Sequence, residues 1–423
     1  MMQKYFFTII LLILFSFLGA SAQENQSINK PDYFIEGGLR YGSMLHHPDN
    51  YDYTKDLWFN SCELRFGLQT HGKNAWERPL KKPILGVALR FTDYADFTDS
   101  KERRKIQRDV LGKNIALFGY VQVPIVRAGF FTWHFQLGMG AAVFTKIYSD
   151  TKQWEANENC ENCHQENGLV SLRVNPYINF QSGFDFRLNN RFDLALNANF
   201  VHTSNASLNF PNWGINEIQG IASVRYHFNQ SENPSKKAEL LEKFKPHNAL
   251  FFTIDPGWMW ARYNNYYYLK TGVSAGYERQ FFPILKAGAA LEFHLSNALT
   301  PTREYKEVYY DGKSYKVPQV LFSSAVFVFG DITFGRFSFS VGAGAYLIRT
   351  QTLDGKTALS NFDLSQTGAY SGTLEKIPWF YEKVGLKISL GKKQNHFVGA
   401  SIRAHFPVAD YLAFTYGYRF WKF

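Results

Sequence analysis

From residue 192 to residue 204 the chain reads Phe192-Asp193-Leu194-Ala195-Leu196-Asn197-Ala198-Asn199-Phe200-Val201-His202-Thr203-Ser204. Residues two apart in a β-strand lie on the same face, and here one face is apolar from Phe192 to Phe200. The other face carries Asp193, Asn197 and Asn199. A strand with one apolar and one polar face is typical of a transmembrane β-barrel, whose wall meets lipid outside and a polar lumen inside.

Segments with the same alternation recur on both sides of this stretch, separated by turn signals. In the first half of the chain they number about eight, an even number, as in single-chain bacterial barrels. The predicted strands are residues 33–42, 58–69, 84–91, 115–126, 133–147, 169–186, 192–203 and 217–228. The sequence therefore predicts an all-β, antiparallel up-and-down barrel.

The lengths of the connections predict how this barrel is oriented. Long polar connections follow the first, third, fifth and seventh strands, and bacterial barrels place their long loops outside the cell. The connections 127–131 and 187–191 are short, as periplasmic turns are. The connection 70–83 should also be periplasmic, although it is longer than a typical turn.

A charged, helix-prone stretch at 229–248 interrupts the pattern and is expected to be a periplasmic linker or helix. A second set of about eight strands fills 249–423. Its last residues, 416–423, alternate and end in Phe423, and they resemble the terminal signal of outer-membrane barrels. Two tandem eight-stranded barrels are favoured over one sixteen-stranded barrel, because the first half looks complete and an eight-stranded barrel fills its own interior.

The beginning of the chain predicts export. Lys4 precedes an apolar run that ends at Leu18, and Ala20-Ser21-Ala22 follows as a small-residue cleavage pattern, so residues 1–22 are expected to be a signal peptide. No other run is long and apolar enough for a membrane-spanning helix. An aromatic content of 17% with a mean hydropathy of -0.27 fits strands that alternate between lipid and lumen. The mature first barrel would then occupy residues 23–228.

The net charge of +10 first suggests anionic partners. For an exported barrel these are the phosphates of lipopolysaccharide, and nucleic acid is not expected because no basic binding motif is visible. The predicted outer loop 94–114 carries Arg103, Arg104 and Lys105, with Arg108 nearby. These residues could bind lipid A phosphates, since arginine suits bidentate phosphate contacts, or they could form a solvated charged loop.

His202 and Ser204 continue the lipid-facing row of the strand at its outer end. Residues two apart on a strand are roughly 6.6 Å apart at their backbones, so an imidazole and a hydroxyl placed there can share a hydrogen bond. A His beside a Ser can act as general base and nucleophile. A polar pair on the lipid face is understandable if its substrate is a lipid.

The segment His202-Thr203-Ser204-Asn205-Ala206, continued by Pro211-Asn212-Trp213-Gly214-Ile215-Asn216, resembles the signature of the PagL-like lipid A 3-O-deacylases, also called acyloxyacyl hydrolases. The ending, from His405 to Tyr411 and then 416–420, is similar to that of longer, two-part members. The resemblance implies removal of an ester-linked 3-hydroxyacyl chain from lipid A in the outer membrane. It implies Ser204 as nucleophile, His202 as general base, Asn205 as oxyanion contributor, and no metal or organic cofactor.

One position departs from that family. The family's acid lies fourteen residues after the His, where this chain has Asn216 instead of Glu. Asn216 has the parity of the lipid face, whereas Glu217 has it only if a bulge re-aims the strand. An amide can orient an imidazole but cannot stabilise imidazolium by charge. Both residues stay candidates for the partner of His202.

Two other motifs carry weaker signals. His294-Leu295-Ser296-Asn297 repeats the letters of the site, but its parity turns His294 and Ser296 toward the lumen. Cys160-Glu161-Asn162-Cys163-His164 fits a haem attachment pattern, yet a disulfide between Cys160 and Cys163 in an outer loop is the better interpretation in an oxidising compartment. Cys62 has no evident partner in the sequence.

Two other functions compete with the enzyme. A catalytically silent barrel could serve as a structural or adhesive protein, with His202 and Ser204 as ordinary rim residues. A single sixteen-stranded barrel would instead have a water-filled lumen and act as a porin or transporter.

Overall fold

The computed structural model of the protein describes residues 32–45, 54, 56–95, 100–151, 167–206, 208–209, 212–228, 244–261, 266–298, 307–310, 313–316, 320–349, 379–405 and 408–421. The predicted signal peptide, the cysteines Cys160 and Cys163, and most of the predicted linker lie outside these ranges. None of the helices in the described ranges combines the length and the apolar character needed to span a membrane.

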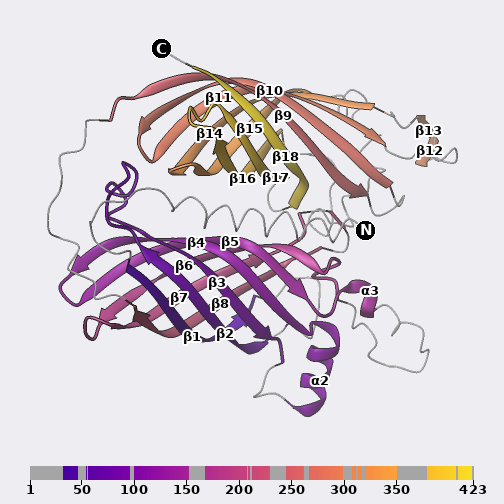
Figure 1. Ribbon diagram of the computed structural model, residues 1–423. Coiled ribbons are helices and arrows are strands. Elements are labelled where there is room, and N and C mark those ends of the chain that lie inside the picture. The colour runs from indigo at the N-terminus through magenta and orange to yellow at the C-terminus, as the bar shows by residue number, and fades with distance from the viewer. Residues whose placement is uncertain are drawn as a thin grey trace.

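The first half forms one closed antiparallel barrel (Figure 1) in which each strand pairs with its neighbours in sequence and β8 pairs with β1. Its strands are β1 (Asp32–Met44), β2 (Trp58–Gln69), β3 (Ile84–Asp93), β4 (Lys113–Ala128), β5 (Phe131–Phe144), β6 (Val174–Arg187), β7 (Phe192–Thr203) and β8 (Ile215–His227). The predicted number of strands is confirmed.

The second half forms another closed antiparallel barrel, in which β18 pairs with β9. Its strands are β9 (His247–Ala261), β10 (Tyr266–Phe282), β11 (Leu285–Ala298), β14 (Val320–Phe334), β15 (Phe337–Arg349), β16 (Phe380–Leu390), β17 (His396–His405) and β18 (Val408–Trp421). A separate hairpin consists of β12 (Glu307–Tyr310) and β13 (Lys313–Lys316). Two tandem eight-stranded barrels are therefore confirmed. The alternative of one sixteen-stranded barrel is wrong, and the porin built on it loses its basis.

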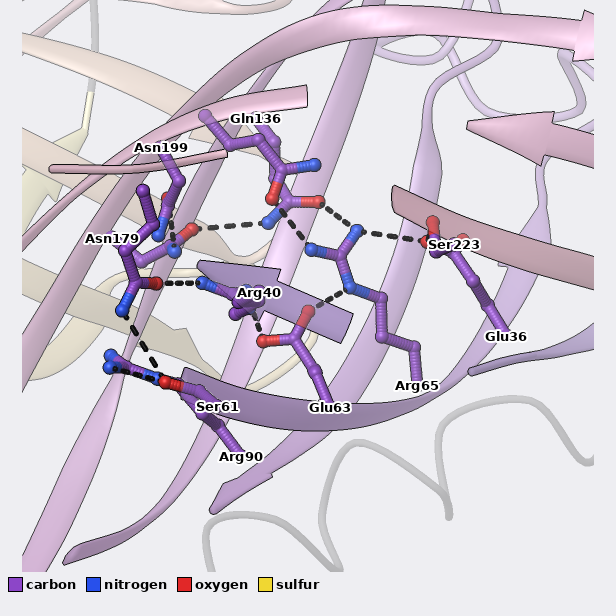
Figure 2. Close-up of polar contacts among 12 residues, drawn as sticks. Glu36, Arg40, Ser61, Glu63, Arg65, Arg90, Gln136, Asn179, Asn199 and Ser223 are labelled. Atoms are coloured by element: carbon purple, nitrogen blue, oxygen red, sulfur yellow. Dashed lines mark hydrogen bonds and ion pairs between the residues drawn. The ribbon is translucent and has the colours of Figure 1, made fainter. Parts of the chain in front are cut away.

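Alternation between lipid and lumen determines which side chains are buried. On β7 and β8 the apolar Leu196 and Ile218 point outward and are exposed, while the polar residues of opposite parity are buried inside. The lumen of the first barrel holds an ion-pair network drawn in Figure 2, in which Arg65 contacts Glu63 and lies 3.5 Å from Glu36. Buried charges are stable when they are paired and hydrogen-bonded in this way. The side chains therefore fill the interior, as in other eight-stranded barrels.

The outer loops close one end of the first barrel with an apolar cluster. The cluster joins buried residues of the strands to residues of the outer loops, among them Leu57, Val110, Leu111, Ile147, Leu169 and Val170. The helices α2 (Lys101–Val110) and α3 (Tyr148–Thr151) lie at this end (Figure 1). The predicted strand 169–186 was wrong at its start, since β6 begins at Val174. Leu169 and Val170 are apolar because they pack into the cluster, so their hydrophobicity does not indicate a strand.

The long connection between β2 and β3 has its own compact structure at the opposite end. The Glu77 carboxylate accepts hydrogen bonds from the backbone N–H groups of Gly72 (2.7 Å) and Lys73 (2.9 Å). Next to it, the Trp76 ring meets the ring of Phe334 edge-on at 6.3 Å between centroids. Phe334 ends β14, so this connection contacts the second barrel. Its unusual length thus has a structural use.

Candidate active site

Strands β7 and β8 place His202 directly beside Asn216. The two residues are partners in the antiparallel register, which runs continuously from Phe192 to Thr203. Side chains of such partners lie on the same face of the sheet, here the face that carries Leu196 and Ile218. His202 Nδ1 lies 2.8 Å from Asn216 Oδ1, and both side chains are half-buried.

This contact determines which nitrogen of the ring carries the proton. An amide oxygen only accepts hydrogen bonds, so Nδ1 of His202 must be the donor. In a neutral imidazole the other nitrogen, Nε2, then has a free lone pair. The pair therefore presents a base on the side of the ring that faces away from Asn216.

Ser204 directly follows the end of β7, and its backbone N–H donates to Pro176 O at 3.4 Å. The residue is only 9% exposed. Gly214, with φ +73°, lies against both Ser204 and His202: a Cβ added to it would be 3.1 Å from Ser204 Cβ and 3.4 Å from His202 Cε1. The ring carbon Cε1, which lies between the two nitrogens, and the side chain of Ser204 therefore border the same small space.

Gly214 is a site residue to which the sequence analysis gave no role. Its positive φ favours glycine, and a side chain would enter the space between Ser204 and the imidazole. Its backbone N–H donates to Leu169 O at 2.9 Å, which ties the site loop to the apolar cluster. The sequence offered one signal for this role: Gly214 is the one glycine of the quoted motif and lies two residues before Asn216.

Asn205 is fully buried, and its hydrogen-bond donors are engaged within the loops. Its side-chain Nδ2 donates to Ser171 Oγ at 3.0 Å and to Asn209 O at 2.9 Å, and its backbone N–H donates to Asn212 Oδ1 at 2.9 Å. The role of Asn205 in an oxyanion hole stays a prediction. The geometry makes it an organiser of the loop that carries Ser204.

The hydrogen-bond donor at the Ser204 hydroxyl is a backbone N–H two residues further along the chain. The backbone N–H of Ala206 donates to Ser204 Oγ at 3.4 Å, and Ala206 has φ +53°. A non-glycine residue with this conformation is uncommon and costs energy. This N–H therefore lies beside the hydroxyl of the expected nucleophile.

Glu217 lies on the opposite face of β8, inside the lumen, and is fully buried. Its carboxylate accepts hydrogen bonds from Arg90 Nη2 at 2.5 Å and from the Tyr94 hydroxyl at 2.7 Å. Burial and the adjacent carboxylate raise the pKa of Tyr94 well above its ordinary value, so Tyr94 stays a donor. Of the two residues left open by the sequence, Asn216 is the one in contact with His202.

The basic residues of the second outer connection, between β3 and β4, lie on α2 instead of in the expected loop. Ser100 caps this helix, its hydroxyl accepting from the backbone N–H of Arg103 at 3.2 Å. Ile106 packs against the apolar cluster, while Lys105 is exposed and Arg103 and Arg104 are half-buried. The three basic residues named by the sequence thus lie at the same end of the barrel as His202 and Ser204, on a different loop.

The repeated motif in the second half is placed as its parity predicts. His294 is buried in the lumen of the second barrel, where its Nε2 lies 3.2 Å from Glu292 Oε2. Cys62 is exposed on the outward face of β2 and is a free cysteine.

Comparison with known proteins agrees with this division of the chain. The family model for lipid A 3-O-deacylase (PagL) matches residues 60–225, and the model for the C-terminal domain of acyloxyacyl hydrolase matches residues 247–422. A search of curated proteins finds no match.

Solved structures with a similar course of the chain are outer-membrane barrels. Neisserial surface protein A is 9% identical, with a TM-score of 0.28, over 46% of this chain and 97% of its own. An outer membrane channel from Pseudomonas putida F1 is 8% identical, with a TM-score of 0.19, over 94% of this chain and 100% of its own. At such TM-scores neither bears on function. The two family models, each matched to one barrel, show that the chain belongs to the PagL family of the bacterial outer membrane, as a two-part member.

Proposed function

We propose that the protein hydrolyses an ester bond of lipid A and releases a 3-hydroxyacyl chain, with Ser204 as nucleophile and His202 as general base. One observation carries the proposal. His202 donates through Nδ1 to Asn216, and the ring carbon between its two nitrogens borders the same space as the side chain of Ser204. A nucleophile, a base and a residue that orients the base are the components of covalent acyl transfer.

In the first step Ser204 Oγ attacks the ester carbonyl carbon, and its proton moves to Nε2 of His202. The carbonyl oxygen becomes negatively charged, and we assign its stabilisation to the backbone N–H of Ala206, which lies beside Ser204 Oγ at 3.4 Å. The carbon–oxygen bond to the sugar then breaks, and the sugar hydroxyl takes the proton from His202. Water, deprotonated by the same imidazole, hydrolyses the acyl-serine and restores the enzyme.

The place of these residues on the barrel fits a lipid substrate. His202 and Asn216 belong to the row of side chains that faces the membrane, and Ser204 follows at the outer end of that row. Lipid A occupies the outer leaflet, so its ester groups reach this wall from the side without entering the lumen. Arg103, Arg104 and Lys105 on α2 are the groups proposed to attract its phosphates.

The neutral Asn216 predicts slow turnover. In serine proteases a change from Asp to Asn at the corresponding position lowers turnover by about 10⁴-fold because the ring takes the wrong tautomer. Here Nδ1 of His202 donates to the amide, so the loss should be smaller. The amide keeps the ring oriented, but it cannot offset the positive charge that forms on His202 during attack. A catalytically silent barrel is the alternative, and activity of the wild-type protein decides between the two.

The test is mass spectrometry of lipid A from a host that expresses the protein. The wild-type protein should remove one 3-hydroxyacyl chain, and Ser204→Ala and His202→Ala should each abolish the loss. Heat-modifiable migration on gels should stay unchanged, because both positions are outside the lumenal network. Unaltered lipid A with a well-folded wild-type protein would favour the silent barrel.

A further inference from the structure

We infer that Arg90 is a positioning residue of the active site: from inside the barrel it holds β8 and β6, the strands on either side of β7. The inference rests on the proposed function and extends it to a residue that touches no lipid. Arg90 belongs to β3, points into the lumen and is completely buried. Figure 2 shows it beside Ser61 of β2, whose hydroxyl lies 3.3 Å from Arg90 Nη2.

The first tether runs from Arg90 to β8. Arg90 Nη2 lies 2.5 Å from Glu217 Oε2, and the side chains of this ion pair are both 0% exposed. Glu217 directly follows Asn216, and successive residues of a strand point to opposite faces. The strand is thus held on its inner face by Arg90 one residue away from the amide that orients His202 on its outer face.

The second tether runs from Arg90 to β6. Arg90 Nη1 donates to the Tyr177 hydroxyl at 3.3 Å, and the guanidinium lies 5.9 Å from the centre of the Tyr177 ring. Tyr177 pairs in register with Thr203, the residue between His202 and Ser204. One guanidinium therefore contacts a sequence neighbour of Asn216 on β8 and the cross-strand partner of the residue between His202 and Ser204.

A guanidinium suits this task because its planar, rigid fork binds several acceptors in fixed directions. In a site that depends on the relative placement of Ser204, His202 and Asn216, a displacement of about 1 Å can cost about 10²-fold in rate. Loss of Arg90 would free β8 to shift against β6 and β7 without removing any group that contacts the substrate. The consequence should be a lower kcat with an unchanged KM.

The same lumen offers a matched control. Arg65 is also buried, pairs with Glu63 and Glu36, and donates to Gln181 at 2.6 Å. Gln181 pairs with Asn199, three residues before His202 and further from the outer end. Arg65 therefore has comparable burial and pairing but no contact with a neighbour of the site.

The experiment compares the double variant Arg90→Met/Glu217→Gln with Arg65→Met/Glu63→Gln. Each removes both members of an ion pair, because one buried charge left alone would be strongly destabilising. Arg40, which also pairs with Glu63, keeps its hydrogen bond to Gln219 Oε1 at 3.0 Å. Kinetics on lipid A in detergent micelles give kcat and KM. In parallel, ¹⁵N NMR of labelled histidine, with His202→Gln to assign the signal, reports the hydrogen bond at Nδ1 independently of activity.

We expect the Arg90 variant to lower kcat by about 10²-fold at constant KM and to lose the hydrogen-bonded Nδ1 signal of His202, while the Arg65 variant retains both. Should the Arg90 double variant fail to fold, Tyr177→Phe, which removes only a hydroxyl, should still lower kcat several-fold. An unaltered His202 signal after loss of Arg90, or equal kcat losses in both double variants, overturns the inference. Inactive wild-type protein would refute the proposed function, and the NMR comparison would still decide the role of Arg90.

Discussion

Replacing Asn216 with Asp should make the protein a faster deacylase. The two side chains have nearly the same shape, so the carboxylate can keep the 2.8 Å contact with His202 Nδ1. The difference is one negative charge next to the ring that becomes positive when Ser204 attacks. The variant therefore tests whether the neutral partner limits the rate.

The size of the effect follows from the distance. Charges centred about 4 Å apart attract each other by about 4 kcal/mol at an effective dielectric constant of about 20. Each 1.36 kcal/mol removed from the barrier raises the rate about tenfold, so Asn216→Asp should accelerate acylation by at most about 10³-fold. Asn216→Glu should gain less, because its extra methylene displaces the ring. Asn216→Ala should be slower than the wild-type protein, because nothing then selects the tautomer.

The assay measures the single-turnover rate at which 3-hydroxy fatty acid is released from lipid A, with mass spectrometry as the detection method. Asn60→Asp is the control. Asn60 is exposed on the outward face of β2 near the outer end of the barrel, so its replacement adds the same charge away from the site. It should leave the rate unchanged. An Asn216→Asp protein no faster than the wild-type one, with the imidazole contact retained, would refute the idea that the missing charge limits catalysis.

Three further changes test the parts around this pair. Gly214→Ala places a Cβ 3.1 Å from the Cβ of Ser204, at a backbone φ of +73°. The variant should lose most of its deacylase activity and about 1–2 kcal/mol of unfolding free energy, measured by urea titration. Full activity would contradict the close packing of Gly214 against Ser204. Ser171→Ala removes an acceptor of the Asn205 side chain. If Asn205 organises the loop, Ser171→Ala and Asn205→Ala should lower activity by similar factors. A loss of about 10²-fold or more in Asn205→Ala alone would support its oxyanion role. Replacing Arg103, Arg104 and Lys105 by Ser should raise KM most at low salt, while the same change at Lys392 and Lys393 in the second barrel should not; equal effects would remove α2 from substrate binding.

The strands were largely predictable from the sequence because lipid and lumen impose a period of two on every one of them. β2 and β7 have the predicted bounds, and the parity of His202, Asn216 and His294 is as predicted. The same parity argument separated Asn216 from Glu217, and only a bulge could have reversed it. The family resemblance supplied the roles of His202 and Ser204, which alternation by itself does not contain.

The loops were less predictable because their contacts join residues far apart in the chain. Asn205 is held by Ser171, more than thirty residues earlier, and no local pattern reveals that its amide is engaged. The connection that contains α2 was expected to be a loop, although Ile106 and Val110 are spaced one helical turn apart. Most residues of this stretch are charged, so the two apolar positions did not stand out as one face of a helix.

The proposed mechanism requires that Ser204 on the outer wall forms a covalent bond to the acyl chain. The most direct test is mass spectrometry of purified protein quenched during reaction with lipid A, followed by mapping of the modified peptide. We expect the added mass of one 3-hydroxyacyl group on Ser204, absent in Ser204→Ala and absent in His202→Ala. An acyl group on another residue, or deacylated lipid A produced by Ser204→Ala, would contradict it.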